Sequence, residues 1–195
     1  MPNPLDYGWW LASRSAGVVS FAAVSGSVIL GLMMANGLPR RRGIKKTLLG
    51  LHESLALVGL AAIAVHGATL LGDSYLRPSI THIAVPFTLG YRPGFTGLGV
   101  IAGYLAAILG LSYYARRSIG VALWRKLHRA TIAVWGLGVI HILGAGTDAG
   151  QLWMRAVLAV TALPIVFLFI LRLMPPPAKQ PAAAGRRSAV QEPAA

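Results

Sequence analysis

The chain has 195 residues, of which 55% are hydrophobic and only 12% are charged, and its formal net charge is +13. A soluble domain carries about twice that charged fraction, so the composition indicates a membrane protein. The chain contains no cysteine, which excludes disulfides, iron–sulfur clusters and thiolate chemistry. The basic residues sit in the gaps between apolar runs, a pattern that membrane topology explains without nucleic acid.

Five apolar segments are each near the roughly 20 residues that a membrane-spanning helix needs. The fourth is the shortest, and the stretch before it, 119–127, can lead into it as an interfacial helix. We therefore predict an all-α membrane protein, a bundle of five transmembrane helices. The start of the chain lacks the basic region of a cleaved signal peptide, so the first span is expected to stay in the mature protein. The predicted spans are Trp10–Asn36, Thr47–Leu71, Phe95–Tyr114, His128–Gly146 and Leu152–Met174.

The basic residues also predict how the bundle lies in the membrane. Fourteen of the eighteen fall in the first loop, the third loop and the C-terminal tail. Loops rich in arginine and lysine stay in the cytoplasm. This places the N-terminus outside and the C-terminus in the cytoplasm of a multi-pass plasma (inner) membrane protein in contact with membrane lipid. Residues 175–195 are rich in proline and alanine and are predicted to form a disordered cytoplasmic tail.

Four of the five histidines form two pairs on the second and fourth spans. His66 follows His52 after a step of fourteen positions, and His141 follows His128 after a step of thirteen. At about 1.5 Å per residue, each segment carries one imidazole near each face of the membrane. The two spans run in the same direction, so His52 is expected to face His128 near the cytoplasm and His66 to face His141 near the outside. This arrangement suits two stacked haems and electron transfer across a membrane.

The step of thirteen fits an ideal helix poorly. A step of fourteen brings His66 within roughly 40° of the helix face of His52, whereas a step of thirteen leaves His141 roughly 140° from His128. Helix crossing, a local distortion near the glycines or different haem tilts must absorb that angle. Gly59, Gly136 and Gly138 lie between the histidines, where they either make room for a flat porphyrin or serve ordinary helix packing.

The histidine spacings, with the Leu51-His52 and Leu127-His128 starts, resemble the ferric reductase-like transmembrane domain family. That family includes the membrane cores of NADPH oxidases and ferric reductases, and the haem subunit of a periplasmic methionine sulfoxide reductase. The resemblance covers roughly residues 9–173, so residues 1–174 are expected to form one such haem domain. Supporting features are the motif at 14–17 that opens the first span, the loop segments 85–87 and 91–93, and residues 144–148.

The resemblance implies two haems b with four axial histidine ligands. His52 and His128 would hold the inner haem, and His66 and His141 the outer haem. Arg14 matches an arginine near the outer haem in the oxidases, although a snorkelling interfacial arginine would look the same. The oxidases carry a flavin and NADPH module after the last helix, and here only about 20 polar residues follow. We therefore expect no flavin on this chain and a separate electron donor.

The sequence thus predicts a di-haem electron carrier, with a cytoplasmic flavoprotein or a quinol as donor. Ferric iron, oxygen or a periplasmic redox enzyme would be the acceptor, which makes the chain an oxidoreductase component. The basic loops either dock an acidic flavoprotein or only set topology. The alternatives are a non-catalytic haem-binding anchor or carrier, and a proton-coupled transporter that uses the histidines as a relay. Two residues are left without a firm role. His82 is either a solvated loop residue or a residue near the acceptor. Asp148 either ends the fourth span or delivers a proton.

Overall fold

The computed structural model describes residues 7–39 and 41–174, so the predicted tail at 175–195 lies outside the described residues. The described part is all helical and contains no strand, as predicted. Five stretches are long and apolar enough to cross a membrane, and the fourth of these comprises α6 and α7 together. The helices are α1 (Gly8–Ala35), α2 (Arg42–Leu70), α3 (Ile80–Ala84), α4 (Pro93–Leu111), α5 (Arg116–Ile119), α6 (Val121–His128), α7 (Thr131–Ala145) and α8 (Leu152–Leu173).

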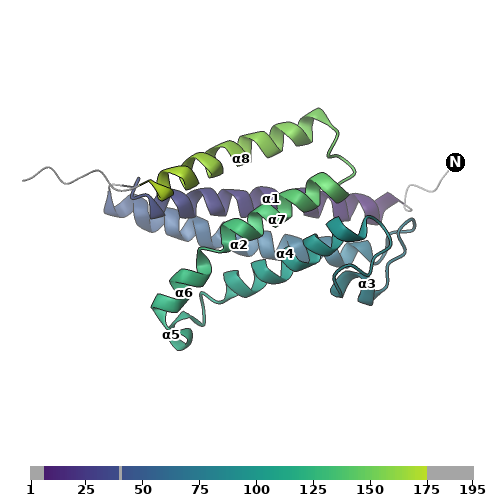
Figure 1. Cartoon of the computed structure of the whole chain (residues 1–195), viewed down its shortest axis with the longest axis horizontal. Coiled ribbons are helices and arrows are strands. Elements are labelled where there is room, and N and C mark those ends of the chain that lie inside the picture. The colour runs from purple at the N-terminus through teal and green to yellow at the C-terminus, as the bar shows by residue number, and fades with distance from the viewer. Residues whose placement is uncertain (1–6, 40, 175–195) are drawn as a thin grey trace, which may run out of the picture.

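The long helices pack as two groups that meet along the length of the bundle (Figure 1). Helices α1 and α2 form a close antiparallel pair, and α8 packs on α1. Helix α4 pairs with α7, and the α2–α4 and α1–α7 contacts join the groups. The start of α1 and the short α3 lie at one end of the bundle, and α5 and α6 lie at the other (Figure 1).

Small residues let α1 and α2 approach closely. Ser13, Ser20 and Ser27 are buried on α1 at intervals of seven residues. A side chain at Gly59 of α2 would meet the Val24 side chain at 2.7 Å and the Ser20 carbonyl oxygen at 3.6 Å. Interfaces of membrane helices favour small residues because lipid supplies no hydrophobic drive to hold helices together. Gly59 therefore serves helix packing, one of its two predicted roles.

Two clusters of buried apolar side chains complete the bundle. Phe21 of α1 packs with Met154 and Leu158 of α8, and a second cluster joins α4 to α7. Many large apolar side chains elsewhere are exposed, such as Leu163 of α8 at 71%. A bilayer, which is as apolar as these side chains, would cover such a surface.

The fourth span differs from its prediction, because His128 does not begin a continuous helix. Helix α6 ends at His128 and α7 begins at Thr131. At the junction the Ala130 amide donates to the Leu127 carbonyl three residues back at 2.9 Å, and the Thr131 hydroxyl donates to the His128 carbonyl at 2.8 Å. His128 and His141 therefore lie on separate helices, and the ideal-helix angle between them does not apply. A helix does precede this span, the amphipathic α6, whereas its place at a membrane interface stays a prediction.

We predict that Gly59→Leu destabilises the bundle, because the new side chain must displace Val24 or separate α1 from α2. Overpacking of this kind costs about 1–3 kcal/mol, so the melting temperature in detergent should fall by several degrees. The control is Gly50→Leu on the same helix, where an added side chain meets nothing within 4 Å. Equal melting temperatures for the two variants would contradict the close α1–α2 contact.

Candidate functional site

The structure brings the four histidines of the spans together as two pairs. The rings of His52 and His128 have centroids 6.1 Å apart and an interplanar angle of 83°. The rings of His66 and His141 have centroids 6.4 Å apart and an interplanar angle of 72°. This confirms the pairing predicted from topology. The 52–128 pair lies toward the end with α5 and α6, and the 66–141 pair toward the end where α1 begins.

A backbone carbonyl of α1 fixes the ring of His66. Its Nδ1 lies 2.8 Å from the carbonyl oxygen of Ser13. A carbonyl only accepts, so Nδ1 is the protonated nitrogen and Nε2 keeps the lone pair. The Ser13 hydroxyl also donates to the His66 carbonyl at 3.1 Å. The serine and histidine thus hold each other at two points.

Ser27 repeats this arrangement at the other level of α1. The Nδ1 of His52 donates to the Ser27 carbonyl at 2.8 Å, and the Ser27 hydroxyl donates to the His52 carbonyl at 3.0 Å. Sequence reasoning missed both serines, because a serine in an apolar span is ordinary packing. The available signal was their spacing, since the step from Ser13 to Ser27 equals the step from His52 to His66.

A carbonyl of α4 fixes the ring of His141 in the same way. Its Nδ1 donates to the Phe95 carbonyl at 2.9 Å. Gly99, one turn further along α4, lies so close that a Cβ there would overlap the His141 ring. Three of the four paired rings therefore present Nε2 with its lone pair.

His128 is held differently. Within the described part of the chain, its buried Nδ1 makes no hydrogen bond of normal length and angle, and the acceptor nearest to making one is the Leu109 carbonyl. The ring instead stacks on Trp124 of α6, with centroids 5.0 Å apart at 27°. The indole nitrogen of Trp124 is the other buried side-chain atom of the described residues that has no partner.

Glycines line the histidine rings, but none of them is among the three that the sequence singled out between the histidines. A Cβ at Gly17 would lie 3.1 Å from the His66 Nδ1, and one at Gly31 would lie 3.2 Å from the His52 Cε1. A Cβ added at Gly136 or Gly138 would meet nothing within 4 Å, so there is open space beside α7 at both positions. The sequence predicted either room for a cofactor or helix packing there. Gly17 and Gly31 therefore let α1 approach the two rings of α2 closely.

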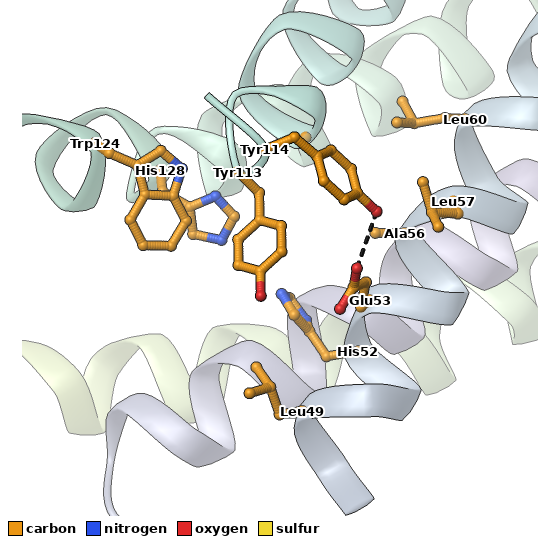
Figure 2. A pocket seen from close by; sticks show the side chains of 11 residues that line it. Leu49, His52, Glu53, Ala56, Leu57, Leu60, Tyr113, Tyr114, Trp124 and His128 are labelled. Carbon is orange, nitrogen blue, oxygen red and sulfur yellow. Dashed lines mark hydrogen bonds between the residues drawn. The ribbon is translucent and has the colours of Figure 1, made fainter. Parts of the chain in front are cut away.

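A pocket opens beside the 52–128 pair, and Tyr113 is among the side chains that line it (Figure 2). It encloses about 490 Å³ of space free of protein atoms, part of it open to the surroundings. The Tyr114 hydroxyl donates to Glu53 at 2.9 Å, and this bond raises the pKa of Tyr114. The pocket is lined by Leu49, His52, Glu53, Ala56, Leu57, Leu60, Gly110, Tyr113, Tyr114, Trp124 and His128.

Arg14, the remaining predicted site residue, forms an ion pair with Asp148. Its Nε and Nη2 both donate to the Asp148 carboxylate, and the Nη2 bond is 2.8 Å long. The guanidinium lies 5.0 Å from the ring centre of Trp10 and 5.7 Å from that of Trp153. The pair ties α1 to the loop before α8, which is a role for Asp148 that the sequence did not reveal. A contact of Arg14 with haem stays a prediction.

His82 lies apart from the pairs, in the loop between α2 and α4. Its ring accepts from the Ser79 amide at 3.2 Å, and its own amide donates to the Ser79 hydroxyl at 3.3 Å. This reciprocal capping box starts the short α3. The structure therefore gives His82 a local structural role.

Among the described residues, no group of three or more His, Asp or Glu side chains could hold a metal ion between them. The histidines instead offer two nitrogen ligands at each level, the number that fills the axial positions of a haem iron. Comparison with family models, curated proteins and solved structures finds no match to this chain.

We predict that the Arg14–Asp148 pair stabilises the bundle. Arg14→Ala and Asp148→Ala should each lower the free energy of unfolding by about 1–3 kcal/mol, because each leaves a charged partner without its hydrogen bonds. The double variant should lose less than the sum of the two single variants. Chemical unfolding in detergent measures the three values, with the exposed Arg155→Ala as control. Strict additivity would show that the two side chains do not interact.

Proposed function

We propose that this protein is a membrane-spanning di-haem b electron carrier, similar in kind to the ferric reductase-like family. The observation that supports it is the placement of two facing imidazole pairs, at two levels of one bundle of apolar helices. His52 and His66 both lie on the continuous α2, and their step of fourteen positions separates the levels by about 21 Å along the helix. That spacing fits one haem near each face of a bilayer core roughly 30 Å thick.

The ring separations fit a shared metal ion at each level. A metal–imidazole nitrogen bond is about 2 Å long, and the ring centre lies about 1.1 Å further, so two imidazoles that held one metal ion between them would have centres about 6.2 Å apart. The observed separations are 6.1 and 6.4 Å.

The hydrogen bonds support the same assignment. A histidine that ligates a metal usually donates its other ring N–H to a carbonyl or carboxylate, which fixes the tautomer and orients the ring. The carbonyls of Ser13, Ser27 and Phe95 fill that role for three of the four histidines.

The residues of this chain would hold and orient the cofactor rather than react. A bound haem supplies reversible one-electron chemistry, and histidine on both sides fills its axial positions. The carbonyls of Ser13, Ser27 and Phe95 fix three ring orientations. No residue needs to exchange a proton with a substrate for electrons to pass between the levels.

The direction of flow follows from the predicted orientation. The 52–128 pair lies at the end with the basic residues of the α4–α6 segment, which the positive-inside rule assigns to the cytoplasm. A flavoprotein or a quinol would deliver electrons there. The 66–141 pair would pass them to ferric iron, oxygen or a periplasmic redox enzyme.

The direct test is the haem content of the purified chain. We expect two haems b per polypeptide, detected by the pyridine haemochrome assay and by a reduced-minus-oxidised spectrum. The double variant His66→Ala/His141→Ala should keep one haem, and His52→Ala/His128→Ala should keep the other. His82→Ala is the matched control and should keep both, because its ring only caps α3. A haem content near zero, or an unchanged spectrum in the double variants, would refute the proposal.

A second prediction tests the space beside His141. Gly99→Leu should remove or distort the 66–141 site, because the added side chain occupies the position of the ring. The total haem should fall by about half, while the 52–128 site remains. Gly103→Ala, one turn along the same helix, places its Cβ 3.5 Å from Ile63, an ordinary contact, and should keep full haem. Full haem content in Gly99→Leu would be evidence against ligation by His141.

A further inference from the structure

The two histidine pairs differ in how firmly their ligands are held. His52, His66 and His141 each donate Nδ1–H to a backbone carbonyl. In the described part of the chain the Nδ1 of His128 makes no hydrogen bond of normal geometry, although the Leu109 carbonyl lies nearby. A ring whose second nitrogen is hydrogen-bonded is a better oriented and more basic metal ligand than a ring without that bond. His128 is therefore the weakest of the four ligands in this arrangement.

The helix that carries His128 is also loosely held. Helix α6 has only eight residues, none of them buried, and it packs on α5 and α4 alone among its principal contacts. It follows Gly120, whose φ of 94° favours glycine, and it ends at His128 beside the break before α7. Figure 1 shows α5 and α6 diverging from α1 and α2 at this end of the bundle. Segments with few buried contacts open locally at small cost in free energy.

The pocket supplies the space for an incoming ligand. It lies between His52 and His128, is lined by Tyr113 and Trp124, and is partly open to the surroundings (Figure 2). The stack of His128 on Trp124 restrains the ring without directing Nε2 as a hydrogen bond would. A small neutral molecule that enters here needs only a modest rotation of one ring.

We propose that His128 is an exchangeable ligand, so that the 52–128 site binds small neutral diatomic molecules, whereas the 66–141 site does not. The inference rests on the proposed haem function and adds a binding activity to one of its two sites. Exchange with carbon monoxide breaks one nitrogen–iron bond and forms one carbon–iron bond. With iron already reduced by dithionite, no electron or proton is transferred in this exchange.

The test uses the full chain, purified in detergent, reduced with dithionite and titrated with carbon monoxide. We expect two haems and one bound carbon monoxide per polypeptide, counted from the haemochrome and from the carbon monoxide difference spectrum. Two haems with no carbon monoxide bound, or with two bound, would overturn the inference and leave the proposed function intact. A chain without haem would overturn both.

Two single variants identify the reactive site. His128→Ala should not raise carbon monoxide binding above one per chain, because that ligand is already the one displaced. His141→Ala opens the 66–141 site and should bind two carbon monoxide molecules per chain. If the haem of the 66–141 site is lost in this variant, the chain should bind one. If His128→Ala bound two while His141→Ala still bound one, the reactive site would be the 66–141 pair and the inference would be wrong. If His128→Ala lost its haem, the remaining haem should bind none.

Discussion

The close antiparallel contact between α1 and α2 determines the rest of the site. Contacts recur every seven residues on both helices, so that Ser13 faces His66, Ser20 lies beside Gly59, and Ser27 faces His52. A contact period of seven residues drifts by about 20° per repeat on a straight helix, and a left-handed supercoil removes that drift. The step from His52 to His66, which is roughly 40° out of phase on an ideal helix, is two such repeats. Both histidines can therefore meet the same helix in the same way.

The step of thirteen between His128 and His141 has a different cause. The acceptor carbonyl for His141 belongs to Phe95, and the carbonyl near His128 belongs to Leu109, fourteen positions further along α4. A continuous fourth helix one residue short of that step would turn His128 away from its partner. The break at Arg129 and Ala130 frees the ring to reach His52, at the cost of the hydrogen bond that the other three rings make. The difference between the two sites thus originates in the step from His128 to His141, which is one residue shorter than the step from Phe95 to Leu109 on α4.

Long apolar runs and the distribution of arginines were enough to predict the five spans and which histidines would meet. Those features depend on segment length and on helix direction, which a sequence shows directly. The serine partners were not predicted, because a carbonyl acceptor carries no residue signature and any residue at 13 or 27 would supply one. The break was not predicted either, since Arg129 and Ala130 are neither glycine nor proline. The Arg14–Asp148 pair joins positions 134 residues apart, and no local pattern marks it.

The position of the histidines would also link binding of the proposed cofactor to the assembly of the bundle. His52 and His66 belong to the group formed by α1, α2 and α8, whereas His128 and His141 belong to the other group. Polar side chains bridge the groups at few places, among them Trp135 to Ser25 and Tyr114 to Glu53. A metal shared by each histidine pair would cross the same boundary twice, once at each level. Because a ligand that binds only the assembled state stabilises that state, the closed bundle and the filled sites are expected to form together.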